Sequence, residues 1–569
     1  MIEISIVLLA VFLLAWPLGY YMTGIFTGQP HFSDKLFSPL ERIIYRILNI
    51  NEERGMGWKD YAIAFLASNL VLGVLFFILF LFQHKLPLNP DGIGPLSWDL
   101  ALHTAISFLT NTDQQHYSGQ AQLSYFSQSI MIVTLQFLTP AMGLAICVAV
   151  LRGLSGGRNS ASAQEGELRD FGNYYVDVTR GVLRLLIPLA CVVALLLTAQ
   201  GVPSSYAGAI KAQLLDSSTG VAEQVIPIGP VAAMVAIKQL GTNGGGWYGP
   251  NSAHPMENPT PVSNVIELIS IILIPMAVVF MAGGLLRNRK FTWMALGAMG
   301  LLSLLFVAAT VYSEHLPNAA FSGLSAVGAN MEGKEVRFGI DTSALWATLT
   351  TQTSNGSVNA MHDSLNPIAG LAALVGMLVN SVWGGIGGGF VNFIVFVWIT
   401  VFLSGLMIGR TPEIFGRKIE TEEITWLGCL IVLPTLLILG CTAIALSIPS
   451  LTANSNPGFH GLSQVFYEYT SAFANNGSGF EGLGDNTVWW NLSTSICLLI
   501  GRYLPLVIPL VVAGSLSSKR VSPASSGSLK LETPTFLFTL VSIILILNVL
   551  SFLPSVVLGP IGESIQLMR

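Results

Sequence analysis

The chain has 569 residues, of which 52% are hydrophobic and only 10% are charged, and its net charge is −5. Water-soluble domains carry about 25% charged residues, so this composition excludes that class and predicts an integral membrane protein in contact with lipid. The small net charge gives no indication of a nucleic-acid partner.

Apolar runs long enough to cross a bilayer recur along the whole chain. The first lacks the basic start and the small-residue cleavage site of a secretion signal, so we expect a retained, extra transmembrane helix over residues 1–24. The run 367–409 is too long for one straight span and contains the sequence GGIGGG, which predicts a broken helix. Ten spans are predicted, near residues 2–24, 62–82, 124–151, 174–199, 262–287, 291–313, 367–409, 424–447, 487–516 and 534–556.

Lysine and arginine residues are distributed unequally between the two sides of this layout. With the N-terminus outside, 19 of the 26 basic residues fall in loops that would face the cytoplasm, six fall outside, and Arg502 falls within a span. The positive-inside rule therefore predicts a multi-pass protein with both termini outside.

Four shorter apolar segments lie on the predicted outer side, and each is followed by a polar stop. At about 7–12 residues they are too short to cross, so we expect re-entrant helices. A single stop of this kind is typical of a surface turn, but four in similar units predict pore loops around a water-filled axis. The short helices are predicted near His103–Leu109, Val231–Leu240, Ala344–Thr351 and Gln464–Phe473.

The predicted fold is therefore an all-α polytopic membrane protein with four helix–pore loop–helix repeats and pseudo-fourfold symmetry. Pore repeats 1 and 2 are expected at 62–151 and 174–287. Repeat 3, with its broken second helix, is expected at 291–409, and repeat 4 at 424–516. An extra C-terminal helix follows at 534–556.

The polar stops share a short core that suits a cation filter. Glycine permits the backbone angles that turn carbonyl groups toward an axis, and rings of carbonyls replace the hydration shell of a monovalent cation. A site for divalent ions more often shows a ring of carboxylates, and here only Asp113 is acidic. Gly244 is expected to face the ion, with Thr242 and Asn243 in the wall. The aligned cores are Thr110-Asn111-Thr112, Thr242-Asn243-Gly244, Ser354-Asn355-Gly356 and Asn475-Asn476-Gly477.

Three further features have a functional and a structural interpretation each. The intramembrane Arg502 is either a fixed positive charge below the filter or one half of a structural pair. Lys238, one turn before the second filter segment, is expected to anchor the C-terminal end of its helix. The glycines of the broken span form either a gate or a close helix contact. They are Gly384, Gly385, Gly387, Gly388 and Gly389.

Several longer motifs resemble one known family, the A subunit of the Kdp potassium-transporting ATPase, within the superfamily of potassium transporters built from four channel-like repeats. The resemblance covers essentially the whole chain. It rests on GTNGGGWYGPNSAHPMENPT (241–260), AMHDS (360–364), GLMIGRTPEIFGRKIE (405–420), NNGSGFEGL (475–483) and AGSLSSK (513–519).

The resemblance implies a filter that binds K⁺ in a bacterial cytoplasmic (inner) membrane. It also implies a complex with a P-type ATPase catalytic subunit, a single-span C subunit that faces the periplasm and a small single-span peptide. The first filter segment in this family often reads Asn-Thr-Asn-x-Gln, which makes Gln115 a filter-adjacent residue here. Asp113 departs from that pattern, and it would either raise the local cation concentration or weaken selectivity.

Two functions remain open from the residues alone. The first is the ion-translocating subunit of an ATP-driven K⁺ uptake pump, not an enzyme by itself and without a covalently bound cofactor. The chain contains neither an Asp-Lys-Thr-Gly-Thr nor a Walker motif, so ATP would act only through a partner. The second is a self-standing K⁺ channel or K⁺ symporter of the same superfamily, driven by the membrane potential.

Overall fold

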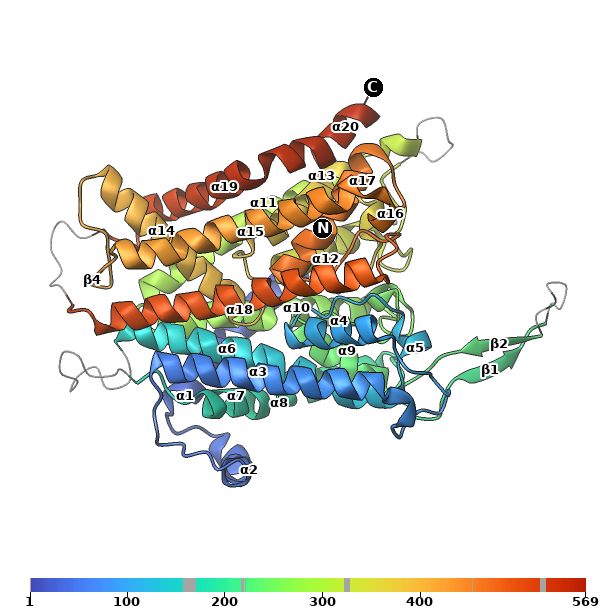
Figure 1. Ribbon diagram of the computed structural model, residues 1–569, viewed down its shortest axis with the longest axis horizontal. Coiled ribbons are helices and arrows are strands. Elements are labelled where there is room, and N and C mark those ends of the chain that lie inside the picture. The colour runs from blue at the N-terminus through green and yellow to red at the C-terminus, as the bar shows by residue number, and fades with distance from the viewer. Residues whose placement is uncertain are drawn as a thin grey trace.

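The computed structural model describes residues 2–156, 170–215, 220, 222–321, 328–452, 454–521 and 529–568. Residue 1 of the first predicted span lies outside these ranges, as do 216–219 and 221 of repeat 2, 322–327 of repeat 3 and 453 of repeat 4. The described chain forms a bundle of roughly parallel long helices with two small β-hairpins, one of which projects from one end of the bundle (Figure 1).

The described residues contain ten helices that are long and apolar enough to cross a membrane, as the sequence predicts. Three of them include π-helical turns, and the last is kinked at Gly559. Their bounds are α1 Ile2–Thr27, α3 Trp58–Leu81, η2 Phe126–Ile132 with α6 Val133–Ser155, α7 Tyr174–Arg180 with η3 Gly181–Leu186 and α8 Ile187–Ala199, α10 Pro261–Leu285, α11 Arg289–Glu314, α14 Gly388–Met407, α15 Thr421–Ser447, α18 Val488–Ser518, and α19 Pro534–Val556 with η7 Val557–Ile561 and α20 Gly562–Leu567.

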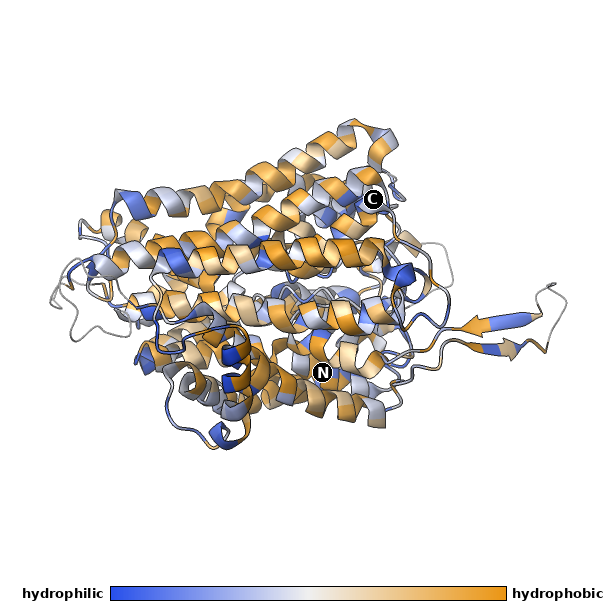
Figure 2. Ribbon diagram, turned by 60° about the horizontal axis from the view of Figure 1, so that its bottom comes forward, coloured by the Kyte–Doolittle hydropathy of each residue, from blue (hydrophilic) through white to orange (hydrophobic). Residues whose placement is uncertain are grey.

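These helices differ in how much of their surface the protein itself covers. The most apolar stretch of α10 is 83% buried, whereas the corresponding stretches of α1, α3 and α19 are each only 28% buried. Because water would penalise the remaining apolar surface, helices of the second kind belong against lipid. Figure 2 shows the resulting band of hydrophobic ribbon along the long helices, with hydrophilic residues gathered at the two ends.

Helix α1 packs along α10, although more than 200 residues separate them in the chain. Gly19 makes the contact close, because a Cβ atom there would lie 2.4 Å from Cβ of Phe280 and 2.7 Å from the carbonyl oxygen of Ala277. A small residue therefore lets the two backbones approach as they do in membrane helix pairs.

Four shorter helices lie between the spans, and each precedes a pore loop. Helix α4 packs on α3 and α18, α9 on α8 and α10, α12 on α11 and α13, and α17 on α15 and α18. The predicted pore-loop repeat fold is confirmed, although α4, α12 and α17 begin five or six residues earlier than the apolar pattern indicates. Their bounds are α4 Trp98–Leu109, α9 Val231–Leu240, α12 Gly339–Gln352 and α17 Gly458–Ala474.

The long apolar run of the third repeat is two helices, α13 (Pro367–Val379) and α14, with a non-helical segment at 380–387 between them. Sequence analysis did not identify the amphipathic helix α2 (Asp34–Ile47) or the antiparallel pair β1 (Ile210–Gln213) and β2 (Glu223–Ile226). The remaining short elements are η1 Gln83–Lys85, α5 Gly119–Gln122, η4 Asn251–Ala253, η5 Ala319–Phe321, η6 His362–Ser364, β3 Glu413–Ile414, β4 Arg417–Lys418 and α16 Pro449–Thr452.

Candidate ion-binding site

The four pore loops share one unusual backbone conformation. In each loop two residues, separated by one, have φ between +49° and +103°, a region that favours glycine. Every second member of these pairs is glycine except in the first loop, where it is Asp113. The pairs are Asn111 and Asp113, Thr242 and Gly244, Ser354 and Gly356, and Asn475 and Gly477.

This backbone corrects the predicted register of the first loop. Asn111-Thr112-Asp113, and not Thr110-Asn111-Thr112, occupies the place of Thr242-Asn243-Gly244. The predicted register was wrong because Thr110-Asn111 has the same two residues as Thr242-Asn243 of the second loop but a different backbone conformation. Thr110 instead caps the end of α4, where its hydroxyl donates to the carbonyl oxygen of Ser107 at 3.0 Å.

Each of the three glycines lies directly against the next pore loop. A Cβ atom at Gly244 would lie 1.9 Å from the carbonyl oxygen of Asn355. The corresponding distances are 2.0 Å from Gly356 to the carbonyl oxygen of Asn476, and 2.2 Å from Gly477 to the carbonyl oxygen of Thr112. Loops two, three, four and one therefore follow one another, with the carbonyl group of a middle residue at each of these three junctions. The ring closes where Asp113 of loop one faces Gly245 of loop two.

Hydrogen bonds from amide side chains also connect neighbouring loops at these junctions. Asn355 Nδ2 donates to the carbonyl oxygen of Lys238 at 3.2 Å, and Asn476 Nδ2 donates to that of Thr350 at 2.8 Å. Both acceptors lie in the last turn of the preceding repeat's short helix, four residues before its first positive-φ residue. The middle asparagines of loops three and four thus tie these loops to the preceding repeats. Asn243 of the second loop donates from Nδ2 to Asn111 Oδ1 of the first loop at 2.7 Å.

The first loop accommodates a carboxylate where the others have glycine. A Cβ atom at Gly245 would lie only 2.6 Å from Cβ of Asp113, so glycine in the neighbouring loop makes the space. Gln136 Nε2 donates to Asp113 Oδ2 at 2.8 Å, while Oδ1 is buried without a hydrogen bond. Burial raises the pKa of Asp113 well above its usual value.

A polar cavity of about 570 Å³, here called the vestibule, opens on one side of the ring. Asp113, Gly244, Gly356 and Gly477 form part of its wall, so all four loops border it. Gln115 also borders it, and its side chain bridges to the second loop by accepting from Gly246 N at 2.9 Å. The vestibule further contains several acids that sequence analysis did not single out: Glu468, Glu481 and Asp485.

A small cavity of about 30 Å³, the lower cavity, lies on the opposite side of the ring. The first positive-φ residues of three loops line it together with Arg502 and three glycines of the GGIGGG segment. Arg502 is 8% exposed, and its Nη2 donates to the carbonyl oxygen of Thr139 at 3.1 Å. Among the described residues no carboxylate forms an ion pair with it. The lining residues from the loops are Asn111, Ser354 and Asn475, and the glycines are Gly385, Gly388 and Gly389.

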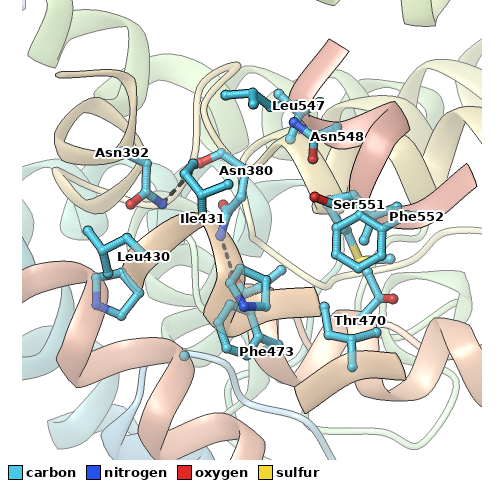
Figure 3. Close-up of a pocket in the computed structure, with 18 of the residues that line it drawn as sticks. Asn380, Asn392, Leu430, Ile431, Thr470, Phe473, Leu547, Asn548, Ser551 and Phe552 are labelled. Carbon is cyan, nitrogen blue, oxygen red and sulfur yellow. Dashed lines mark hydrogen bonds between the residues drawn. The ribbon is translucent and has the colours of Figure 1, made fainter. Parts of the chain in front are cut away.

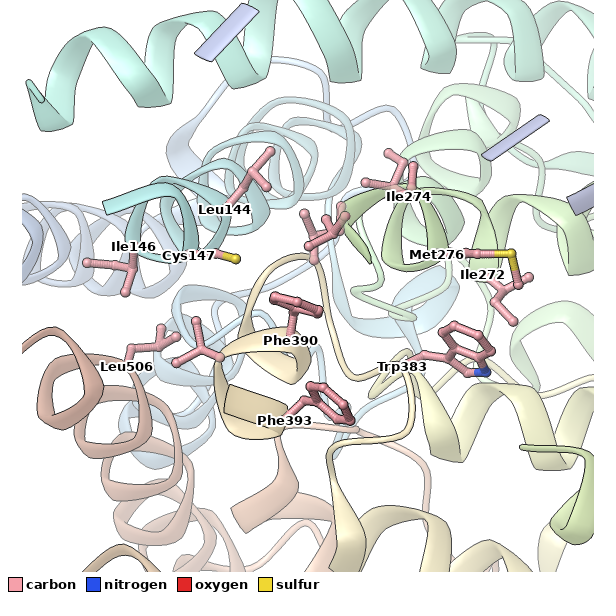
Figure 4. Close-up of a cluster of buried hydrophobic side chains, with 14 of the residues drawn as sticks. Leu144, Ile146, Cys147, Ile272, Ile274, Met276, Trp383, Phe390, Phe393 and Leu506 are labelled. Carbon is pink, nitrogen blue, oxygen red and sulfur yellow. The ribbon is translucent and has the colours of Figure 1, made fainter. Parts of the chain in front are cut away.

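The segment 380–387, here called the crossing loop, is packed tightly against the underside of the ring. Its Ile386 N donates to Thr242 Oγ1 at 3.1 Å. Gly384 and Gly389 touch backbone to backbone, since a Cβ atom at Gly384 would lie 2.0 Å from Cα of Gly389. Figure 4 shows the apolar side chains around this loop, with Trp383, Phe390 and Phe393 on its own repeat.

Asn380 connects the crossing loop with the fourth repeat. Ser354 Oγ donates to Asn380 Oδ1 at 2.8 Å, and Asn380 Nδ2 donates to the carbonyl oxygen of Ala474 at 3.2 Å. Beside it lies a mainly apolar pocket of about 90 Å³, into which Asn392, Thr470 and Asn548 contribute polar groups (Figure 3). The lower cavity and this pocket share Asn380 and Asn392 in their walls.

Lys238 is completely buried and its side chain is used for structure. Its Nζ forms an ion pair with Glu257 and donates to Asn251 Oδ1 at 2.6 Å and Ser252 Oγ at 2.8 Å. Asn251 in turn donates to the carbonyl oxygen of Gly244 at 2.6 Å. The lysine therefore braces the second pore loop through the segment that follows it.

Comparison with known proteins gives concordant results. The family model described as potassium-transporting ATPase A subunit matches residues 5–565. A potassium-transporting ATPase potassium-binding subunit from Gloeobacter violaceus is 47% identical over 96% of this chain and 94% of its own length. One of the same description from Pseudomonas aeruginosa is 45% identical over 97% and 96%.

One solved structure gives independent support for the fold. The potassium transporter TrkH from Vibrio parahaemolyticus aligns with 89% of this chain and 98% of its own, with a TM-score of 0.51 and 14% sequence identity. At that identity the likeness shows a common architecture of pore-loop repeats.

Proposed function

The chain belongs to the family of potassium-binding A subunits of the potassium-transporting ATPase, which are transport subunits and not the catalytic one, and we propose that its four pore loops are the potassium filter. The observation that carries this proposal is the ring in which three glycines lie against the carbonyl groups of Asn355, Asn476 and Thr112. Backbone oxygens in such a ring replace the hydration shell of a monovalent cation.

The proposed ligands are backbone carbonyl groups, and the side chains have supporting roles. The C-terminal ends of the four short helices face the loops, and their partial negative charge favours a cation. Asp113 adds the single carboxylate of the ring itself. The proposed filter comprises Thr110, Asn111, Thr112, Asp113, Thr242, Asn243, Gly244, Ser354, Asn355, Gly356, Asn475, Asn476 and Gly477, with Gln115 and Lys238 adjacent.

We place the vestibule and both termini outside, in a bacterial inner membrane, because the basic loops lie at the other end of the bundle. The four repeats at 62–151, 174–287, 291–409 and 424–516 would then pass K⁺ inward from the vestibule. The guanidinium of Arg502 and the crossing loop lie on this route below the ring, so both are proposed to control the passage of K⁺. Their position supports a gate better than a helix contact, since three of the five glycines line the lower cavity.

Active uptake requires ATP hydrolysis that this chain does not perform. We therefore propose a P-type ATPase catalytic subunit, a single-span C subunit and a small single-span peptide as partners. Purification from the native membrane tests this: we expect these proteins to copurify and to hydrolyse ATP in response to K⁺. A lone chain that carries K⁺ without ATP would contradict it and favour the channel or symporter alternative.

The role of Arg502 is tested separately in that complex. Arg502→Gln keeps a polar side chain but removes the positive charge beside the ion route. We expect the apparent K⁺ affinity or the ratio of K⁺ transported to ATP hydrolysed to change about tenfold, since one charge close to an ion is worth more than 1 kcal/mol. Unaltered transport kinetics would exclude the proposed role.

A further inference from the structure

A second cluster of chemically reactive side chains lies in the vestibule and has no part in the filter. His116 follows the first pore loop, Glu468 is on α17, and Asp485 precedes α18. One nitrogen and two carboxylate oxygens from these three residues all lie within 4.8 Å of one another. His116 and Glu468 are buried, and Asp485 is half-buried. The vestibule gives the cluster access to solvent.

His116 presents to this cluster a nitrogen that makes no hydrogen bond and is within ion-pair distance of Glu468. The residue is 2% exposed, and its Nε2 makes no hydrogen bond, while Glu468 Oε1 lies 3.4 Å away. An ordinary imidazolium–carboxylate hydrogen bond would be about 2.7–2.9 Å long. A buried polar atom without a partner is costly, so a ligand of the nitrogen would remove a penalty.

Hydrogen bonds behind His116 determine which of its nitrogens has the free lone pair. Asn491 Nδ2 donates to Asp99 Oδ2 at 2.9 Å, and a carboxylate can only accept, so the orientation of this amide is fixed. Asn491 Oδ1 must then accept from His116 Nδ1 at 2.7 Å. In the neutral ring the proton is therefore on Nδ1, and the lone pair of Nε2 points to the carboxylates. This is the arrangement that outer hydrogen bonds impose on metal-binding histidines.

Two further contacts hold the cluster in place. Gln114 Nε2 donates to Glu468 Oε1 and orients that carboxylate. The ring of His103 is stacked on that of His116, with centroids 3.8 Å apart and planes inclined by 13°. The imidazole and one carboxylate are thus pre-positioned, and the second carboxylate offers an oxygen within 4.8 Å of both.

We propose that His116, Glu468 and Asp485 form a binding site for a divalent transition metal ion of the Zn²⁺ class. One imidazole and two carboxylates are a donor set that zinc accepts, with water in the fourth position. The two carboxylates would neutralise the charge of the ion. Occupancy would cancel the negative charge that attracts K⁺ into the vestibule, so it inhibits transport. This inhibition rests on the proposed route through the vestibule, whereas metal binding does not.

The binding test uses the purified complex after removal of metals by EDTA. Zn²⁺ is titrated against a chromophoric chelator, and we expect one tight site that is lost in His116→Ala and weakened at least tenfold in Asp485→Asn. His84→Gln, which changes an exposed histidine outside the cluster, is the matched control and should keep the site. Equal Zn²⁺ binding in the wild type and both cluster variants overturns the proposal, and so does displacement of Zn²⁺ by millimolar Ca²⁺.

The transport test compares, for each protein, the rate of K⁺-stimulated ATP hydrolysis with Zn²⁺ and the rate without Zn²⁺. We expect Zn²⁺ to inhibit K⁺-stimulated ATP hydrolysis of the wild type and of His84→Gln, and to inhibit His116→Ala at least tenfold less. If the variants lose the metal but wild-type hydrolysis ignores it, the metal site stands and the route through the vestibule is refuted. Inhibition that persists in His116→Ala shows that this site is not the inhibitory one.

Discussion

The first pore loop and the other three have the same backbone but differ in what they place at the ring junction. Gly244, Gly356 and Gly477 bring bare backbone against the next loop, whereas Asp113 inserts a carboxylate at the equivalent position. The left-handed conformation survives in both cases. The cost of a side chain there is met by the neighbouring loop, where Gly245 lacks the atom that would collide.

The ring therefore constrains pairs of facing residues and not single positions. A side chain is excluded at Gly356 because the obstacle is a backbone carbonyl group, which cannot be trimmed by substitution. At Asp113 the only potential obstacle is the side chain of the facing residue 245. That residue is glycine, so there is no side chain to collide with. A residue with a side chain can therefore replace glycine at a ring junction only where the facing atoms belong to a side chain that substitution can shorten.

The largest effect is expected from Gly356→Ala. Its Cβ atom would lie 2.0 Å from the carbonyl oxygen of Asn476, and a left-handed residue with a side chain adds about 1–2 kcal/mol. We expect K⁺ affinity to fall about 100-fold or more, measured as K⁺-stimulated ATP hydrolysis of the complex. Gly300→Ala on α11, where nothing lies within 4 Å, is the control and should behave as wild type.

The next effect tests the pairing itself. Gly245→Ala should collide with Asp113, and overpacking of this kind costs about 1–3 kcal/mol, or roughly 30-fold in K⁺ affinity. Asp113→Gly in the same chain should restore most of the loss, but it should give no rescue of Gly356→Ala. Equal rescue of both variants would show that Asp113 and Gly245 are not a pair.

Asp113→Asn tests the negative charge of residue 113 while it keeps the size and shape of the side chain. The amide keeps the volume and can retain a hydrogen bond with Gln136, but it removes the only carboxylate of the ring. We expect roughly tenfold weaker K⁺ binding, which corresponds to about 1.4 kcal/mol. Isotope-exchange or calorimetric measurement of K⁺ binding at constant ionic strength checks this, and tighter binding would show that the acid is a hindrance.

The smallest effect is expected from Gln136→Leu, which leaves Asp113 Oδ2 without its donor. Because the vestibule can supply water to the carboxylate, we expect only about a threefold change in K⁺ affinity. A double-mutant cycle with Asp113→Asn measures the coupling. Additive effects of the two substitutions would indicate that Gln136 acts through its other acceptor, the carbonyl oxygen of Gly245.

Much of the architecture could be predicted from the sequence because lipid imposes a simple rule on the chain. The apolar run of α10 is long enough to span the membrane and that of α9 is too short, so their lengths alone distinguish a span from a re-entrant helix. The polar segments after the short helices then mark the pore loops. The register of the first loop could not be predicted, because Thr110-Asn111 and Thr242-Asn243 are alike in letters and differ in φ. Side-chain partners were also inaccessible: Gln136 lies 23 residues from Asp113 and Glu468 lies 354 from Gln114, without a spacing that links them.

The packing of α1 along α10 has a consequence for biosynthesis. At translation rates of roughly 5–20 residues per second, the first helix waits about 12–50 s in the bilayer before its partner emerges. During that interval it is held by lipid alone, and its mean hydropathy of 2.2 allows this. The face of α1 that contains Gly19 is meanwhile open to any other nascent helix. Slower synthesis of the chain lengthens this interval and therefore raises the risk of mispaired intermediates at this step, before any defect reaches the filter.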